Sequence, residues 1–313
     1  MNNYRCNAIN LESQKVLFAN LLDTAESKDQ YHRINCEGFG RIRSFSNFSM
    51  HLESDVLSKR KFNRFGSVAG SYTSQVFQVA MCDLHCWYCF VDKSNRNGSN
   101  MSSKYLSANE LLDLCIDNGE YPKNIDISGG SPDLVPEFVL WILEAVEQRG
   151  FKGKISIWVD SNLNSKYYET CLSKPDLEYI SDFPNFRFLC SLKGWDEESA
   201  YFNSGITGTF KQQLDCLRFF VEHKMNLYLY VTLISSKIPT EKDLRKLFDL
   251  LYDIDKDLPT YTIPLGIKPF HAVTDKAKRN ILDSWSSQMN CAKIWDTILL
   301  EHYNASYILD KFK

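Results

Sequence analysis

The 313-residue chain lacks the long apolar runs and the one-sided charge that mark several broad classes of protein. No apolar stretch approaches the roughly 20 residues that span a bilayer, so a membrane-spanning protein is not expected. The first ten residues, MNNYRCNAIN, lack the basic-then-apolar pattern of a secretory signal. Lys and Arg number 36 against 39 Asp and Glu, so neither nucleic acid nor an anionic membrane is expected as a partner. We therefore expect a cytoplasmic protein.

The sequence also has no internal repeat and no dense cysteine framework. Its ten cysteines are scattered through a large mixed sequence, and without a secretion signal we expect them to be reduced thiols. Apolar material, in contrast, is plentiful. With 44% hydrophobic and 13% aromatic residues the chain can bury a large core, which excludes intrinsic disorder.

From residue 76 onward the sequence alternates between strand-like and helix-like segments. The strand-like runs are residues 76–81, 124–128, 154–160, 186–192, 226–234 and 261–267. Helical signals fall between them, such as Ser107 with Glu110 three residues later, which is a capping box. The other predicted helices are residues 132–150, 164–172, 208–224 and 240–254. Continuous apolar strands joined by crossover helices predict a parallel α/β sheet, covered on both faces or closed as a partial barrel, with ligands at the carboxyl ends of its strands.

This pattern divides the chain into three predicted parts. Residues 1–75 form an N-terminal extension that is partly helical, with one helix expected near residues 11–25. Residues 76–270 form the barrel, and residues 271–313 form a C-terminal segment of one or two helices. The basic stretch at residues 59–64 is expected to be a solvated linker, and His271 is expected near the barrel mouth.

Three cysteines lie within eight residues at the end of the first predicted strand, in VFQVAMCDLHCWYCFVDKSN (residues 76–95). The spacing of Cys82, Cys86 and Cys89, C-x3-C-x2-C, lets one tight loop aim three sulfurs at a common centre. Burial as small hydrophobes is the weaker explanation, because a strand-end loop is a poor place to bury three thiols. Structural zinc is a stronger alternative, with His85 as the fourth ligand. An iron–sulfur cluster with one open iron fits better, because adjacent His85 and Cys86 would have to bind the same zinc ion.

The C-x3-C-x2-C spacing, with Tyr88 just before the last cysteine, resembles the signature of the radical S-adenosylmethionine (radical SAM) superfamily. The resemblance implies a partial (β/α)6 barrel of the radical SAM type. It also implies one 4Fe-4S cluster on Cys82, Cys86 and Cys89, with S-adenosylmethionine (SAM) bound to the fourth iron. An electron from a reductant such as flavodoxin or ferredoxin would then split SAM into a 5′-deoxyadenosyl radical that abstracts hydrogen from a substrate.

The stretch SGGSP after the second predicted strand resembles the GGEP-like motif of this superfamily. On that resemblance Gly129, Gly130, Ser131 and Pro132 would hold the methionine amino group of SAM. Ser131 replaces the more usual Glu, so the contact would come mainly from a backbone carbonyl. An ordinary strand-to-helix turn is the alternative explanation.

Two further strand ends carry residues that resemble SAM-binding positions of the superfamily. Asp160 and Asn162 resemble a polar cluster placed near SAM, although helix capping would also explain them. Lys193 matches the lysine of glycyl-radical activating enzymes and would reach the SAM carboxylate; a solvated surface lysine is the alternative. Ser191 stands where those activating enzymes have Asp, which weakens the match to them.

Three functions remain open at this point. The first is a radical SAM enzyme that acts directly on a small molecule or peptide. The second is an activase that installs a glycyl radical on a partner protein, and the third is a non-enzymatic, zinc-stabilised α/β binding protein. Beyond Cys216 the only cysteine is Cys291, so one cluster is expected rather than two.

Substitution of the cysteines tests the ligand assignment. Replacing Cys82, Cys86 or Cys89 with Ala should abolish iron and sulfide binding, because each thiolate would be a ligand. Replacing Cys115 or Cys216, each on an apolar helix face, should at most loosen packing. The measurement is iron and sulfide per chain after anaerobic reconstitution, and equal losses in all five variants would show that the assignment is wrong.

Overall fold

The computed structural model describes residues 4–28, 33–44, 73–116, 121–267, 273 and 285–304. Residues 59–64 and His271, for which the sequence predicted a linker and a place near the barrel mouth, lie outside these ranges. None of the helices within the described ranges is both long and apolar enough to cross a membrane.

All six predicted strands are present, and they form one parallel sheet. In spatial order they are β5 (Thr73–Val79), β7 (Asn124–Gly129), β8 (Ser156–Ser161), β9 (Phe186–Leu192), β10 (Leu227–Thr232) and β11 (Thr262–Leu265). Each strand pairs in parallel with the next along the chain. This order is the parallel partial barrel that the sequence predicted.

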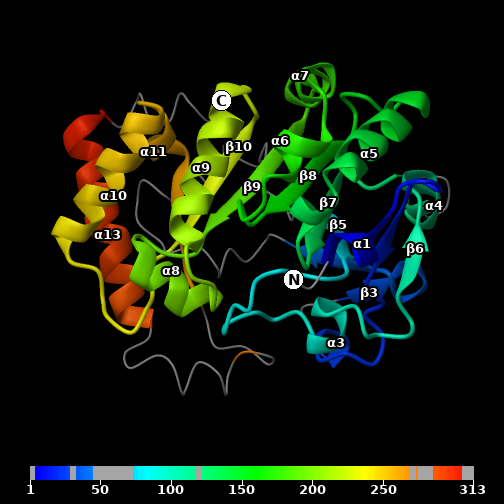
Figure 1. Ribbon diagram of the computed structural model, residues 1–313, viewed down its shortest axis with the longest axis horizontal. Helices are drawn as coiled ribbons and strands as arrows, with labels where there is room; N and C mark the ends of the chain where they lie inside the picture. Colours follow the sequence, from blue (N-terminus) through cyan, green and yellow to red (C-terminus); the bar gives the residue numbers. More distant parts are fainter. Residues whose placement is uncertain are drawn as a thin grey trace.

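Helices connect these strands, as Figure 1 shows. They are α3 (Lys93–Arg96), α4 (Ala108–Leu114), α5 (Pro136–Gln148) after the short η3 (Pro132–Leu134), α6 (Tyr167–Cys171), α7 (Lys174–Asp182), α8 (Glu197–Ser204), α9 (Thr209–Glu222), α10 (Glu241–Ile254) and α11 (Leu258–Tyr261). The predicted capping box at Ser107 is confirmed. The sequence prediction missed α7 and α8, although each begins with a capping box of its own. A C-terminal helix, α13 (Trp285–His302), packs beside α10.

The helix predicted near residues 11–25 is wrong. After α1 (Tyr4–Ala8) the chain forms β1 (Ile9–Asn10), a tight turn and β2 (Lys15–Phe18), with η1 (Glu26–Lys28) further on. In β2 every second side chain is buried, which is the period of a strand. Residues 33–44 add β3 (Arg33–Asn35), η2 (Cys36–Gly38) and β4 (Gly40–Ser44), while β6 (Lys104–Leu106) pairs with β2. Strands β2 and β4 both join β5, so this part of the chain extends the same sheet.

The parallel sheet has one apolar face and one face that mixes polar with apolar side chains, called the polar face below. Partners in register point to the same side of a parallel sheet, and along one side lie Phe77, Ile127, Val159 and Phe188. This side packs against the helices: the ring of Phe188 lies 5.3 Å from Tyr168 of α6 and 4.7 Å from Phe220 of α9. The opposite side carries Arg41, Asp126 and Asp160. In a barrel the helices lie outside, so the polar side faces the interior.

The glycine turn at the end of β7 packs directly against the end of β5. The amide of Gly130 donates to Val79 O at 2.9 Å, and the amide of Ser131 donates to Met81 O at 2.9 Å. A Cβ atom added to Gly130 would lie 2.0 Å from Met81 O. Real Cβ atoms do not approach a backbone oxygen so closely. Glycine is therefore required here by the chain's own packing, whatever else the turn binds.

Alanine substitution tests this packing. Gly130→Ala should lower the free energy of unfolding by about 3 kcal/mol or more, because backbone atoms on both sides would have to move. Gly150→Ala is the control: Gly150 has a φ of +74° but nothing within 4 Å of the added Cβ. That variant should lose only about 1 kcal/mol, from the left-handed backbone. Urea unfolding of both proteins provides the comparison, and similar losses would contradict the close approach at Gly130.

Candidate functional site

The cysteine loop begins with a sharp change of backbone direction at the end of β5. Met81 has a left-handed backbone with a φ of +77°, which costs about 1 kcal/mol for a residue with a side chain. Two hydrogen bonds hold this conformation: Met81 N donates to Asn95 O at 2.9 Å, and Cys82 N donates to Arg96 O at 2.8 Å. The segment after the cysteines therefore folds back and fixes the loop's first thiol.

The three motif cysteines share this loop and differ in exposure. Cys82 is buried, while Cys86 and Cys89 are partly exposed. The amide of Cys89 donates to Cys86 O at 3.1 Å, so a tight turn separates the last two thiols. Tyr88 lies between them, and its hydroxyl is 3.2 Å from Thr232 Oγ1 at the end of β10.

The arrangement does not favour the zinc alternative. The side chain of His85 is exposed, whereas Cys82 is buried. Across the described residues, no group of three or more His, Cys, Asp or Glu side chains is arranged to hold a single metal ion. A zinc site requires its thiolates within about 2.3 Å of one point. Without His85 the three motif cysteines would leave a zinc ion short of a fourth protein ligand, whereas three thiolates are enough to hold a four-iron cluster with one open iron.

The glycine turn and the end of β8 meet beside the first cysteine. The side-chain amide of Asn162 donates to Gly130 O at 3.3 Å and lies 4.0 Å from Cys82 Sγ. Its backbone amide donates to Asp133 Oδ2 at 2.7 Å. Asn162 does not cap a helix, because α6 has no side-chain cap hydrogen bond. Gly130 O, Asn162 and Cys82 thus share one small region at the carboxyl ends of the strands.

Lys193 is buried rather than solvated, so the surface-lysine alternative is wrong. Only 6% of the residue is exposed, and Nζ donates to Ser191 Oγ at 3.0 Å. Burial lowers the pKa of Lys193, but the neighbouring Tyr88 hydroxyl and the three motif cysteines outweigh it and raise the pKa above its ordinary value. The ammonium group is therefore retained beside the cysteine loop.

Asp160 lies on the polar face, one strand from the glycine turn. Its Oδ2 accepts a hydrogen bond of 2.5 Å from Ser128 Oγ, and Ser128 immediately precedes Gly129. Burial raises the pKa of Asp160, while the Ser128 hydrogen bond and the positive charges of Arg43 and Lys193 act in the opposite direction. The two other motif residues, Ser131 and Pro132, are buried at the start of η3.

Two buried amides that the sequence analysis missed connect these strand ends. Asn203 of α8 donates from Nδ2 to Lys193 O at 2.7 Å and to Ile234 O at 2.6 Å, and its Oδ1 accepts from Trp87 Nε1 at 2.9 Å. It therefore ties the cysteine loop to the ends of β9 and β10. The capping box at Asp196 was the available signal for α8.

Gln213 of α9 makes equivalent contacts between the ends of β8 and β9. Its Nε2 donates to Asn162 O at 2.6 Å and to Ser191 O at 2.8 Å, and its Oε1 accepts from Lys193 N at 3.0 Å. The residue is fully buried. Gln213 lies next to the buried Leu214 and three residues after the buried Phe210, and a buried amide needs hydrogen-bond partners.

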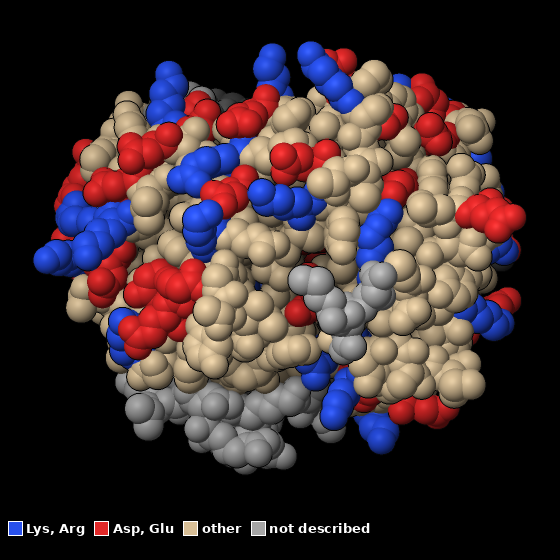
Figure 2. Space-filling view, viewed as in Figure 1, with Lys and Arg blue, Asp and Glu red and all other residues tan. Residues whose placement is uncertain are grey.

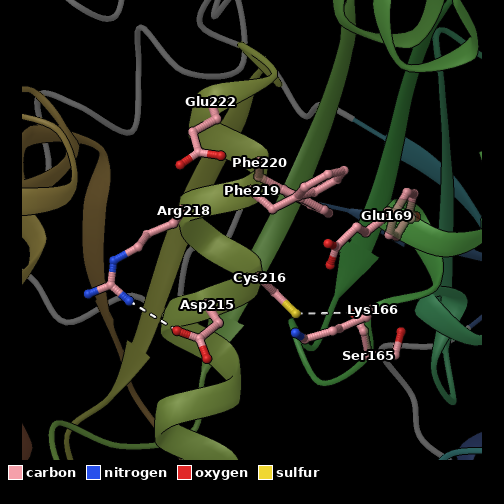
Figure 3. A pocket seen from close by; sticks show the side chains of 10 residues that line it. Ser165, Lys166, Glu169, Asp215, Cys216, Arg218, Phe219, Phe220 and Glu222 are labelled. Atoms are coloured by element: carbon pink, nitrogen blue, oxygen red, sulfur yellow. Dashed lines mark hydrogen bonds and ion pairs between the residues drawn. The ribbon is translucent and has the colours of Figure 1, made fainter. Parts of the chain in front are cut away.

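A separate cavity of about 210 Å³ lies between α6 and α9, on the helix-covered side of the sheet (Figure 3). Cys216 lines it and donates from Sγ to Ser165 O at 3.0 Å, and Phe220 lines it as well. Because Phe220 packs on the apolar face of β9, this cavity is not part of the cysteine site.

On the surface, acidic and basic side chains are interspersed over the face shown in Figure 2.

Removing the Asn203 amide tests its positioning role. Asn203→Ala would leave two buried backbone carbonyls without this partner, at about 1–3 kcal/mol for each group, and would also remove the acceptor of the partly buried Trp87 Nε1. We expect a large loss of stability and of iron bound per chain after reconstitution. The control is Asn226→Ala, because the exposed Asn226 makes only a 3.3 Å hydrogen bond to Ser181 O. Full iron content in Asn203→Ala would contradict the role assigned to this amide.

Comparison with known proteins identifies the family of the chain. The model of the radical SAM superfamily matches residues 79–251, more than half of the chain. No curated protein sequence matches it. Among solved structures, SuiB of Streptococcus suis bound to the precursor peptide SuiA is 18% identical over 57% of this chain and 36% of its own, with a TM-score of 0.41.

Two other solved structures show a similar degree of likeness. Native anSMEcpe with bound AdoMet is 20% identical over 61% of this chain and 50% of its own, with a TM-score of 0.41. The cobalamin-dependent S-adenosylmethionine radical enzyme OxsB is 14% identical over 71% and 30%, also with a TM-score of 0.41. The chain thus spans half or less of each structure. On the family match, the chain belongs to the radical SAM superfamily.

Proposed function

We propose that this enzyme cleaves SAM reductively at a single 4Fe-4S cluster held by Cys82, Cys86 and Cys89, and acts on a small molecule or peptide. The observation that carries the proposal is the position of Gly130 O and Asn162 beside Cys82 at one end of the sheet. At the same end Asn203 is hydrogen-bonded to both Trp87 of the cysteine loop and the backbone oxygen of the buried Lys193. When bound, the reduced cluster and SAM supply a 5′-deoxyadenosyl radical that abstracts hydrogen from the substrate.

The chain's own residues provide complementary contacts for SAM. Three thiolates leave one iron of a four-iron cluster without a protein ligand. The carbonyl of Gly130 is an acceptor suited to the SAM amino group, and the Lys193 ammonium is suited to the SAM carboxylate. Burial of Lys193 strengthens that ion pair, because little water competes for it.

Apolar residues around the cysteine loop would keep water away from the reaction. Trp87, Tyr88 and Phe90 pack against a cluster of Ile234, Ile267 and Val273. A dry, low-dielectric surrounding both strengthens electrostatic contacts and limits side reactions of a radical. The electron would come from a reductant such as flavodoxin or ferredoxin.

No specific observation favours the activase alternative. Ser191 occupies the position where those enzymes have Asp, and its hydroxyl accepts a hydrogen bond from Lys193 Nζ where a carboxylate would form an ion pair. The substrate is therefore proposed to be a small molecule or peptide that enters the barrel, rather than a glycine of a partner protein.

The dependence of SAM cleavage on Lys193 tests the proposal. Anaerobically reconstituted protein with dithionite and SAM should form 5′-deoxyadenosine. In Lys193→Met, the SAM concentration that gives the half-maximal rate should rise by about tenfold or more. A charge-assisted hydrogen bond contributes about 1.5–3 kcal/mol, and this variant loses it. The control is Lys237→Met on the surface, where the ion pairs of Lys237 are exposed. Absence of 5′-deoxyadenosine from the unmodified enzyme, or an unchanged SAM requirement in Lys193→Met, would contradict the proposal.

A further inference from the structure

Two carboxyl side chains lie diagonally across neighbouring strands on the polar face of the sheet. Asp126 of β7 is in register with Trp158 of β8, and Asp160 lies two residues further along β8, on the same side. Asp126 is only 1% exposed, and its Oδ1 has no hydrogen-bond partner. Within the described residues neither carboxyl forms an ion pair, and Asp160 accepts only the Ser128 hydrogen bond.

An unpartnered buried carboxyl is costly in its ionised form. Burial, together with the adjacent Asp160, raises the pKa of Asp126 to about 8, although Arg43 and Arg41 lower it. A cation placed between the two carboxyls would remove both the desolvation cost and their mutual repulsion. The pair is therefore better suited to bind a positive group than to stand alone.

Two arginines of β4 act on the pair: Arg43, which lowers the pKa of both carboxyls more strongly, and Arg41. Within the described residues neither arginine forms an ion pair with either carboxyl. Arg41 lies 3.6 Å from Glu26, and both side chains are 2% exposed. Its guanidinium also lies 5.6 Å from the centre of the Phe90 ring, just after the cysteine motif. Arg41 thus has its own counter-ion, and it does not form an ion pair with Asp126.

The carboxyl pair is continuous with the proposed SAM site. Asp160 is hydrogen-bonded to Ser128, which precedes the glycine turn, and the charge of Lys193 acts on Asp160. A ligand bound to the pair would therefore lie on the barrel interior, close to the place where the radical is generated.

We propose that Asp126 and Asp160 bind a cationic nitrogen of the substrate, so that the substrate is a small molecule or peptide carrying an amine. This inference rests on the proposed function, because it identifies the class of molecule from which hydrogen is taken. Asp126 provides the buried contact, and Asp160 connects that contact to the strand ends that hold the SAM-facing residues.

A thermal-shift experiment on the reconstituted full-length protein tests the inference. The probe is n-butylamine at millimolar concentration, with n-butanol and butyrate as neutral and anionic controls. Butylamine should raise the Tm by about 2 °C or more, through binding to the folded state only. Butanol and butyrate should not. Stabilisation by butyrate equal to that by butylamine, or no shift with butylamine, would overturn the inference.

Substitution of the buried carboxyl gives the second measurement. Asp126→Asn should abolish the butylamine shift while leaving the Tm of the free protein unchanged or higher. The substitution replaces an unpartnered carboxyl with a neutral amide of similar size. Asp249→Asn, on the exposed surface of α10, should keep the full shift. A butylamine response that survives in Asp126→Asn, or a free Asp126→Asn protein with a clearly lower Tm, would show that Asp126 is structural.

These outcomes separate the inference from the proposed function. If butylamine stabilises the unmodified protein but no 5′-deoxyadenosine forms from SAM, the radical function fails and the amine site remains. If SAM is cleaved but butylamine gives no shift, the radical function remains and the substrate class assigned to the carboxyl pair is wrong.

Discussion

The contact between the glycine turn and the end of β5 is the constraint on which the rest of the site depends. Because Gly130 has no side chain, its amide reaches Val79 O and the next amide reaches Met81 O. Met81 is the last residue before Cys82, so the turn fixes where the cysteine loop leaves the sheet. The same turn presents Gly130 O to Asn162 beside Cys82. A larger residue would separate these segments of the site.

Two buried amides extend this constraint across the other strands. Asn203 binds groups from the cysteine loop, β9 and β10, and Gln213 binds the ends of β8 and β9. Backbone groups at strand ends have no ladder partner, so side-chain amides satisfy them and at the same time fix their distances. Side chains of helices α8 and α9 thereby fix the backbone around Asn162, Ser191 and Lys193.

The sequence predicted the parallel sheet correctly because short runs rich in β-branched and aromatic residues alternate with helical signals along the chain. It also placed the cysteine loop correctly after the first strand, β5, because the apolar run at residues 76–81 ends directly before Cys82. It failed for residues 11–25, where helix-like spacing is overridden by pairing of β2 with β5 and β6. It also missed α8, whose sequence EESAYFNS has little apolar periodicity. The burial of Lys193 and the close approach at Gly130 depend on packing between distant segments, which no local pattern reveals.

The central claim is that three cysteines hold a cluster whose fourth iron is open to SAM. The most direct measurement is electron paramagnetic resonance of the dithionite-reduced, reconstituted protein, recorded with and without SAM. The account predicts a reduced four-iron signal that changes when SAM is added, because SAM becomes a ligand of the open iron. A protein that takes up no iron, or a signal indifferent to SAM, would contradict it.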